Sequence, residues 1–448
     1  MLSAHGSARS APERNDNKMS MNYFTKSVAA GLGCLLLAGC GVQSSIPSLT
    51  SEPAPQSSAP SLTGEITPNN VSGKEPDAAF AQAQSGFTLK LLQETAAACA
   101  GKNILISPYS VMQALAMTAN GAAGDTRSQM EQTLGGLPAE QLNQYLLTQR
   151  REMPDSENAR FRTANSVWLR DDKDRLQVKP DFLQTLRDYY GADAFARAFD
   201  ESTRQEINQW CSGQTEGMIP EMLSEPISPD AVMYLINAVC FDAKWAKLYE
   251  QEPVNVRFTS CTGAEQQSKM MFSEEGQYLS DDRAEGFIKP YRDGYVFAAL
   301  LPEQGLSAED YLASLTDDRL HEILTGAEPC TVNAGLPQFS YDFDIEYSGI
   351  LSDMGMPLAF AGDADFTEMA ETASGVLYIG QVLHKTHIDV DTEGTKAAAV
   401  TAVEMRDNCD AEQEAPKQVT LDRPFVYFIA DAETMTPVFA GVLNEIPQ

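Results

Sequence analysis

Few side chains in this 448-residue sequence have the types and spacing that catalysis or metal binding needs. The sequence holds no GxSxG or HExxH motif, no phosphate-binding loop and no dinucleotide-binding glycine pattern. His384 and His387 lie three residues apart in "QVLHKTHIDV", where the alternation of a strand would direct them to opposite faces. We therefore expect a hydrogen-bonded core histidine at His384 and a surface histidine at His387. The sequence predicts no catalytic residue, no metal site and no cofactor.

The cysteines do not form a metal-binding pattern either. Cys34 and Cys40 lie in the N-terminal apolar region, and the other six show no CxxC pair and no zinc-type spacing. Their wide scatter is more typical of individual buried residues than of a small disulfide scaffold, and their pairing stays open. These six are Cys99, Cys211, Cys240, Cys261, Cys330 and Cys409.

The charge excludes one class of partner. The formal net charge is −31, with 63 acidic residues against 32 basic ones. Because binding to nucleic acid requires clustered Lys and Arg, we expect no DNA, RNA or sulfated-polysaccharide partner.

The N-terminus is typical of an exported protein. Lys26 precedes an apolar run over residues 28–38 and the sequence "LLAGC", which ends at Cys40. This arrangement resembles a bacterial lipoprotein signal, in which Cys40 would carry the lipid; the alternative is an ordinary secretory signal with an incidental cysteine. Residues 1–40 are thus predicted to be leader and signal peptide, with Met19 or Met21 as plausible starts. The location would be a lipid-anchored one at the bacterial cell surface, or extracellular.

Residues 41–76 are predicted to be a disordered tether, because they are rich in Ser and Pro and poor in core-forming residues. The folded body should begin near Asp77. Helical periodicity dominates its first part, and strand patterns dominate after residue 255. The run "AVMYLINAVCFDAKWA" suits a strand that is buried on both faces in the middle of a sheet. No repeat and no internal linker interrupts the body, so we predict one large α+β domain.

One segment is undecided between helix and strand. Residues 392–408, "TEGTKAAAVTAVEMRDN", combine an alanine run, which favours helix, with β-branched Thr395, Val400, Thr401 and Val403, which favour strand.

Seven stretches between residues 78 and 447, in the same order along the chain, resemble the serpin family. They are "NILISPYSVMQALAMTANGAAGDT", "INQWCSGQTEGMI", "LINAVCFDAKW", "VNAGLPQFSYDFDIEYSGILSDMGMPLAF", "ADFTEM", "VLHKTHIDVDTEGTKAAAVTA" and "VTLDRPFVYFI". The resemblance implies a serpin fold at residues 77–448, with three β-sheets, eight or nine helices and an exposed reactive-centre loop at about residues 392–418.

By this resemblance, residues 392–408 would form the loop that inserts into a sheet. As a strand, it would point only small or apolar side chains inward. Gly394 would be the flexible pivot where the chain reverses. The inward set is Thr395, Ala397, Ala399, Thr401, Val403 and Met405, and the hinge implied by the resemblance is Gly394, Thr395, Lys396, Ala397, Ala398, Ala399, Val400 and Thr401.

The resemblance implies a suicide inhibitor of serine proteases, and also of cysteine proteases. The target would cleave the loop, form an acyl-enzyme and be trapped as the loop inserts. The partner is therefore a protease in covalent complex with an otherwise monomeric chain. The alternative is a non-inhibitory serpin that acts as a surface binding protein. One departure from the family is Thr392, which replaces the usual acidic residue two positions before the hinge glycine; Glu393 stands beside it.

The resemblance also implies a polar cluster beneath the point where the sheet parts, and a tryptophan at the top of the sheet. Polar residues within apolar stretches are costly unless they hydrogen-bond one another. The cluster would comprise Ser107, Ser110, Asn208, Asn237 and His384, with Trp245 at the end of the central strand.

The position of the reactive bond depends on how the loop is counted. Counting the family's register from Gly394 gives Asn408–Cys409, whereas counting back from Pro424 gives a bond nearer Gln413. We prefer the first count, since insertion length is fixed by the sheet. Arg406–Asp407 is the main alternative.

Overall fold

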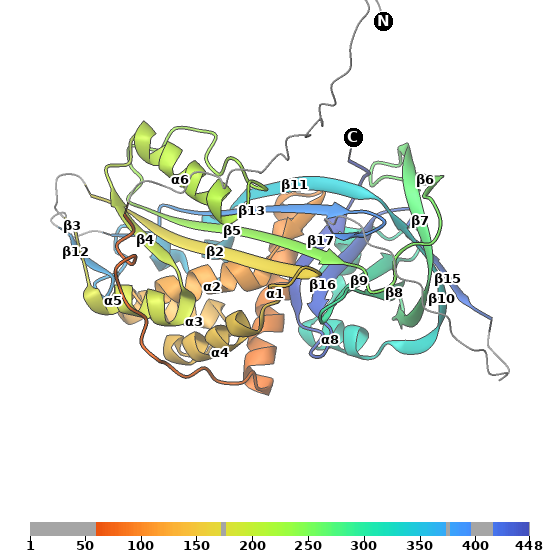
Figure 1. Cartoon of the computed structure of the whole chain (residues 1–448), viewed down its shortest axis with the longest axis horizontal. Helices are drawn as coiled ribbons and strands as arrows, with labels where there is room; N and C mark the ends of the chain where they lie inside the picture. Colours follow the sequence, from red (N-terminus) through yellow and green to blue (C-terminus); the bar gives the residue numbers. More distant parts are fainter. Residues whose placement is uncertain (1–59, 172–175, 373–376, 396–414, 448) are drawn as a thin grey trace, which may run out of the picture. The chain divides into compact units, whose positions relative to one another are not determined.

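The computed structural model describes residues 60–171, 176–372, 377–395 and 415–447, which all belong to one compact unit, Glu52–Gln448. In the part of the chain that is described, nine α-helices accompany three β-sheets (Figure 1). The predicted α+β class and the single domain with three sheets are confirmed. The helices are α1 (Ala78–Ala98), α2 (Pro108–Ala119), α3 (Gly124–Thr133), α4 (Ala139–Glu152), α5 (Pro180–Thr185), α6 (Glu201–Gln214), α7 (Ala308–Ser314), α8 (Asp317–Thr325) and α9 (Ser348–Met354), with the π-helix η1 (Leu186–Tyr190) and the 3-10 helix η2 (Pro357–Phe360).

The six-stranded sheet carries the central apolar strand. Its order is β11 (Phe339–Glu346), β13 (Gln381–Val390), β14 (Gly394–Thr395), β5 (Met233–Lys244), β2 (Ala159–Arg170) and β4 (Asp193–Arg197). β5 is antiparallel to β2 and parallel to β13, and nearly all its residues are buried. This explains the continuous apolar run, because both faces of β5 are covered.

The nine-stranded sheet holds the C-terminal core. Its order is β1 (Ile104–Ile106), β17 (Pro437–Leu443), β16 (Phe425–Asp431), β9 (Tyr295–Pro302), β8 (Ala284–Pro290), β7 (Glu265–Ser280), β10 (Glu328–Pro337) and β15 (Lys417–Thr420), with β6 (Val254–Thr259) paired to β7. A third, two-stranded sheet joins β3 (Leu176–Val178) to β12 (Ala370–Thr372). Every residue of β17 is buried, so this end of the chain is locked into the core.

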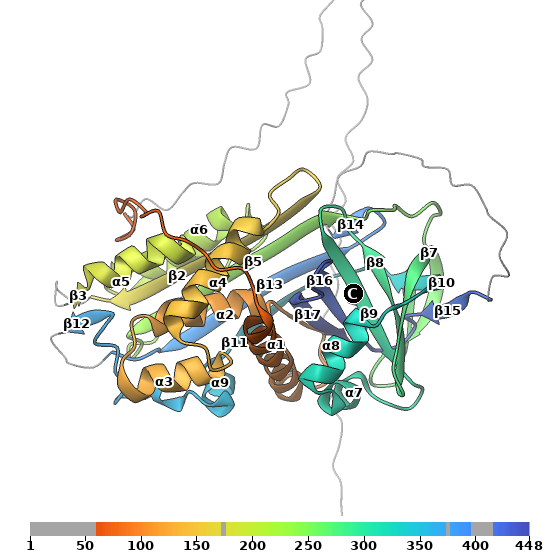
Figure 2. The same ribbon diagram turned by 90° about the horizontal axis from the view of Figure 1, so that it is seen from below.

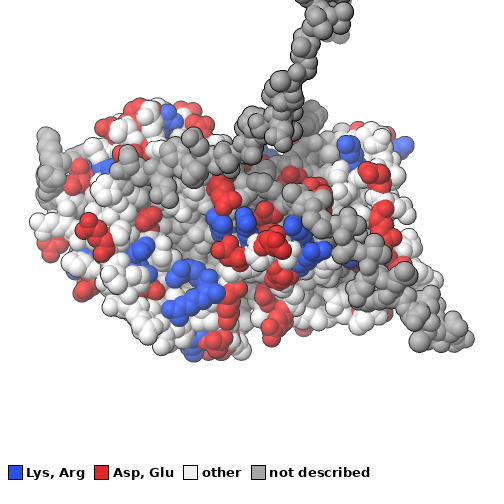
Figure 3. Space-filling model, in the orientation of Figure 1, with Lys and Arg blue, Asp and Glu red and all other residues white. Residues whose placement is uncertain are grey.

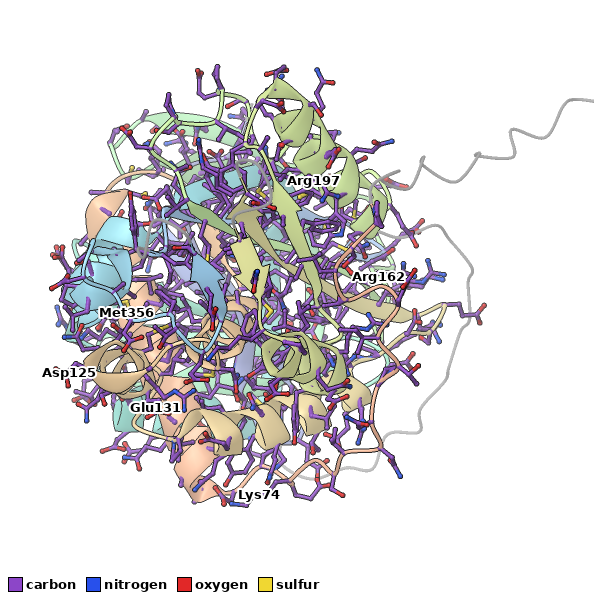
Figure 4. The ribbon with its side chains drawn as sticks, turned by 90° about the vertical axis from the view of Figure 1, so that its left-hand side faces the viewer. Lys74, Asp125, Glu131, Arg162, Arg197 and Met356 are labelled. Carbon is purple, nitrogen blue, oxygen red and sulfur yellow. The ribbon has the colours of Figure 1, made fainter. Side chains whose placement is uncertain are left out.

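Helices cover both faces of the six-stranded sheet. α2 packs on one face against β2 and β5, and α6 lies on the opposite face (Figure 1). Trp210 of α6 joins Trp168 and Tyr234 of the sheet in a separate apolar cluster. Arg197, at the end of β4, lies beside α6 (Figure 4). Its Nε lies 2.7 Å from Oε2 of Glu206 in that helix, and this ion pair holds α6 in place.

Helix starts follow capping chemistry that the sequence displays. Asp77 caps α1, since its carboxylate accepts the amide of Phe80, and Ser107 caps α2 before Pro108. Both helices therefore begin directly after a side chain that caps them.

Residues 60–76 differ from the predicted tether. Leu62 donates its amide to Ala194 O at 2.7 Å, and the buried Thr63 hydroxyl donates to Ala192 O at 3.1 Å. Farther on, the Asn69 amide and side chain donate to Asp188. A Ser/Pro-rich stretch can form such contacts without a core of its own, because backbone and hydroxyl groups suffice. The part of the tether at residues 41–59 lies outside the described residues.

The described surface carries its charges in mixed groups. Figure 3 shows small sets of Lys and Arg beside Asp and Glu on one face. One set joins Arg160 and Arg162 to Glu216, with Arg162 Nη1 2.7 Å from Glu216 Oε1. Within the described residues, no helix combines the length and apolarity that a membrane crossing requires.

Candidate functional site

The lower part of the site is a buried polar cluster between α2 and the six-stranded sheet. His384 Nε2 accepts the Ser107 amide at 3.1 Å, so the proton of the neutral ring is on Nδ1. Nδ1 lies 2.7 Å from Asn237 Oδ1 and donates to it. Burial lowers the pKa of His384 to about 3, because the charged ring would lose its hydration in the core. The prediction of a hydrogen-bonded core histidine agrees with this geometry.

The cluster continues as a directed chain of hydrogen bonds. The Asn237 amide donates to Ser110 and to Asn165 Oδ1, the latter at 2.6 Å. Asn165 in turn donates to Gln113 Oε1 at 3.2 Å, and Gln113 donates to the Tyr109 hydroxyl at 2.6 Å. Each donor in the chain points the same way, so a single backbone amide at its start sets the orientation of every amide side chain that follows.

The structure brings together four of the five residues predicted for this cluster, and adds others. Ser107, Ser110, Asn237 and His384 meet, but Asn208 does not join them. Asn208 Oδ1 instead accepts the amides of Met222 and Leu223, and its amide donates to Leu223 O at 2.9 Å. Asn208 therefore fixes the loop after α6, and it lies on the opposite face of the six-stranded sheet from α2.

Asn165 and Gln113 were missed by the sequence reasoning. Both are buried, in β2 and α2 respectively. Asn165 stands among other polar residues of β2, such as Thr163 and Ser166, so no local pattern distinguishes it. Gln113 stands in an apolar helix and follows Ser110 by three residues, on the same face. Applying the criterion of a polar residue in an apolar stretch to α2 would have found Gln113.

The upper part of the site is the turn that joins β13 to β14. Asp391 holds this turn, since its carboxylate accepts the amides of Glu393 and Gly394. Trp245, the first residue after β5, then clamps the turn. Its backbone amide donates to Glu393 O and its indole Nε1 donates to Asp391 O, each at 2.9 Å. The predicted position of Trp245 at the end of the central strand agrees with the structure.

Gly394 and Thr395 already lie inside the sheet. Thr395 pairs with Val390 of β13 on one side and with Ala243 of β5 on the other. Its side chain is 1% exposed and its Oγ1 lies 2.7 Å from the Tyr291 hydroxyl. The inward orientation predicted for Thr395 therefore agrees with the structure.

Gly394 is required for a reason other than the one predicted. A Cβ at this position would lie 2.1 Å from Ala243 O, so no side chain fits between the hinge and β5. The reversal of the chain lies earlier, at residues 391–393, and is held by the Asp391 carboxylate. Gly394 is thus a point of close backbone approach.

The acidic residue at the hinge has moved by one position, and its role differs. Glu393 Oε2 is buried and has no hydrogen-bond partner, whereas its backbone carbonyl accepts the Trp245 amide. In the described residues, no cation pairs with Glu393, so backbone contacts hold the turn here.

The two ends of the loop are anchored in different sheets. β14 begins the loop in the six-stranded sheet, and β15 ends it parallel to β10 in the nine-stranded sheet (Figure 2). The predicted loop at 392–418 therefore begins in the turn before β14 and ends within β15. The remaining predicted hinge and bait residues lie outside the described residues, as does Cys40; they are Lys396, Ala397, Ala398, Ala399, Val400, Thr401, Arg406, Asp407, Asn408 and Cys409.

β13 and β5 stop pairing with each other where β14 begins. These strands pair directly over Gln381–Thr386 and Tyr234–Val239, and then separate to admit β14. A strand that continued from β14 would have to replace this direct pairing with two new ladders.

Cys99, Cys211 and Cys261 are thiols, and no group of three metal-ligating side chains gathers in the described part of the chain.

Comparisons with known proteins agree with this geometry. A family model described as "Serpin (serine protease inhibitor)" matches residues 82–446. The leukocyte elastase inhibitor of Xenopus laevis is 30% identical over 76% of this chain and 92% of its own length. The crystal structure of the thermophilic serpin tengpin in its native state is 40% identical, with a TM-score of 0.81 over 86% of this chain and 99% of that one. The latent state of tengpin gives a TM-score of 0.73 at 38% identity, over 84% of this chain and 100% of that one.

Proposed function

This chain belongs to the serpin family, and we propose that it is a suicide inhibitor of serine endopeptidases and, by the same acyl-enzyme chemistry, of cysteine endopeptidases. The observation that carries the proposal is the position of Gly394 and Thr395, which form the first rung of a new strand between β13 and β5. A static surface loop would have no reason to begin inside the sheet. The residues that follow, 396–401, are small or β-branched apart from one lysine, which strand alternation would direct outward.

The proposed mechanism uses the catalytic residues of the target alone. A protease attacks the loop at Asn408–Cys409, or at Arg406–Asp407, and its own nucleophile becomes acylated by the new C-terminal end of the loop. The freed strand then extends from Thr395 between β13 and β5, and carries the attached protease with it. The acyl bond persists because the protease is distorted before water can hydrolyse it.

Strand insertion supplies the driving force. An inserted strand gains hydrogen bonds to both neighbours and buries its small apolar side chains, at the cost of the direct pairing between β13 and β5. The uncut protein is then a kinetically trapped state whose barrier includes the buried cluster around His384 and Asn237.

Incubation with a panel of trypsin, elastase, chymotrypsin, subtilisin and papain tests the proposal. We expect a complex that survives denaturing electrophoresis with at least one of them, and mass spectrometry of the released fragment would identify the bond cut. Clean cleavage by every protease, without a complex, would refute it.

The Tm of the protein recovered after cleavage distinguishes the proposal from its alternative, a non-inhibitory serpin that binds a partner at the surface. For a non-inhibitory serpin, cleavage of the loop would leave the Tm unchanged. An inserting loop instead raises the Tm of the cleaved protein, because the sheet gains a strand.

We also propose that the chain is exported and anchored through a lipid on Cys40. The support is the apolar run that ends in "LLAGC". Metabolic labelling with a fatty acid in a bacterial host should label the chain, and Cys40→Ala should abolish the label. An unlabelled chain in the host would contradict the anchor and leave the inhibitory proposal intact.

A further inference from the structure

A buried ion pair lies beside Trp245, the residue that clamps the hinge turn. Lys289 of β8 and Glu275 of β7 place Nζ and Oε1 2.7 Å apart, and their side chains are 1% and 5% exposed. Nζ also donates to Lys247 O at 3.3 Å, and the Ser273 hydroxyl donates to the same carboxylate oxygen at 2.6 Å. Two charges are removed from water here at a considerable desolvation cost, which stability alone does not justify.

The ion pair touches the residue that clamps the hinge turn. The Lys289 ammonium lies 5.2 Å from the centre of the Trp245 ring and 4.3 Å from that of Tyr249. Tyr291, the first residue after β8, forms an isolated bridge with Trp245 and stacks on its ring, with ring centroids 4.3 Å apart. Lys289 and Tyr291 therefore fix the indole in one position, since a cation and a parallel ring both bind its π-faces.

From Trp245 the contacts reach the first rung of the inserting strand. The indole and the backbone amide of Trp245 hold the carbonyls of Asp391 and Glu393, and the Tyr291 hydroxyl holds Thr395 Oγ1. A displacement of Trp245 would therefore loosen both the turn and the strand that follows it.

The ion pair also lies in line with the other end of the loop. Glu275 is the register partner of Val332 in β10, and Val332 is the partner of Lys417, the first residue of β15. One row across the nine-stranded sheet thus joins the carboxylate to the strand where the loop ends, about two strand spacings or ~10 Å away.

We propose that Lys289 and Glu275 are positioning residues that hold Trp245, and through it the Thr395 rung, in register between β13 and β5 before the loop is cut. The pair would hold the chain's own loop at the gap between β13 and β5, and so prevent other strands from entering that gap. This role rests on the proposed function, because it concerns the start of loop insertion.

The pair is interdependent. Burial lowers the pKa of the Lys289 ammonium, and the Glu275 carboxylate opposes this shift. Removal of the lysine alone would leave a buried unpaired carboxylate, so a fold defect must be separated from a positioning defect. The double variant Lys289→Met/Glu275→Gln leaves no uncompensated charge and serves this purpose.

The first test measures hydrogen exchange in the uncut, full-length protein. In Lys289→Met and in the double variant, amides of residues 391–395 should exchange at least about tenfold faster, while those of β16 (Phe425–Asp431) stay unchanged. Glu265→Gln is the control, because Glu265 also lies on β7 and the change breaks only its exposed pair with Arg257 of β6. Equal acceleration in β16, or none at residues 391–395, would overturn the proposal.

The second test compares two insertion reactions. A synthetic peptide of residues 395–407 should enter the uncut double variant faster than the wild type, because the gap is less firmly held. The variant's own loop should insert less efficiently, so more inhibitor is consumed for each trypsin trapped. General destabilisation would accelerate both reactions, and that result would refute positioning.

The two proposals fail in different ways. A wild-type protein that traps no protease and gains no Tm on cleavage would contradict the inhibitory function, while the exchange of residues 391–395 would still decide the positioning role. A wild-type inhibitor whose variants match it in both tests would contradict the positioning role alone.

Discussion

Two regions border the line where β13 and β5 must part, and they are built from different chemistry. The lower region, around His384 and Asn237, consists of uncharged groups in a directed hydrogen-bond chain. The upper region, around Trp245, consists of stacked rings and a buried ion pair. The strands are still paired at the lower region, whereas at the upper one they already admit β14.

The difference indicates how the sheet can open. A chain of short hydrogen bonds loses most of its energy when one member moves, so it resists opening until a strand replaces it. Rings and a cation tolerate small displacements, because their attraction is less directional. Opening is therefore expected to begin at Thr395 and to reach the cluster around Asn237 later.

Thr395→Arg should have the largest effect, because it changes the upper region where insertion begins. The side chain would place an unpaired guanidinium in a position that is 1% exposed, which the sheet cannot accommodate. We expect no trapped protease and no rise in Tm when the loop is cut, as measured by denaturing gels and calorimetry.

Thr262→Arg is the matched control for this change, since Thr262 is exposed in the turn between β6 and β7. It should trap proteases like the wild type. A complex formed by the Thr395→Arg variant would show that the loop does not enter at this point.

Asn237→Ala tests the lower region and should have the next largest effect. It leaves several buried partners without a bond, among them His384 Nδ1 and Asn165 Oδ1. At about 1–3 kcal/mol for each unsatisfied group, we expect a loss of about 3–5 kcal/mol in the uncut protein, measured as the shift of its urea midpoint.

Asn208→Ala is the same substitution at the residue that does not join the cluster. It removes bonds to the part-buried loop at Met222 and Leu223, and should cost about 1–2 kcal/mol. If both variants lost equal stability, the contrast between the directed chain and an isolated cap would be wrong.

Protonation of His384 at acid pH should reduce the free energy of unfolding by less than Asn237→Ala does. The folded protein holds the pKa of His384 at about 3, below the 6.5 of a free side chain. Neutral His384 is favoured by folding, so its contribution is fully present above pH 6.5 and is lost as the pH falls towards 3. The loss should reach about 2 kcal/mol at pH 5, seen as a falling urea midpoint.

His387→Ala should retain this loss, because His387 lies on the other face of β13 beside Asp342. His384→Gln should remove it, since glutamine does not titrate. A pH profile that followed His387 instead would move the titrating group out of the cluster.

Much of the fold was predictable from the sequence, for identifiable physical reasons. Ser107 before Pro108 is a strong helix start, and the apolar run of β5 suits only a strand covered on both faces. His384 and Asn237 were detectable because a polar side chain in an apolar run must find a partner.

The rest depends on tertiary contacts that leave no local pattern. Glu275 is one of 63 acidic residues, and nothing near it in sequence distinguishes it as the buried partner of Lys289. The contacts of residues 60–76 are made through backbone groups and short polar side chains, which a composition rich in Ser and Pro does not reveal. Asn208 shows the opposite error, since a polar residue near an apolar stretch found its partners in its own loop.

Tyr291→Phe should give the smallest effect and therefore tests the upper region most finely. It removes the hydroxyl that lies 2.7 Å from Thr395 Oγ1 and keeps the ring that stacks on Trp245. We expect the free energy of unfolding of the uncut protein to fall by about 1 kcal/mol, measured from the shift of its urea midpoint. Faster amide exchange should be confined to residues 394–395. Because the stack and the ion pair remain, trapping of proteases should be nearly normal. A loss as large as that of Asn237→Ala would mean that the upper region also depends on one directional bond, and the order of opening argued above would then have no basis.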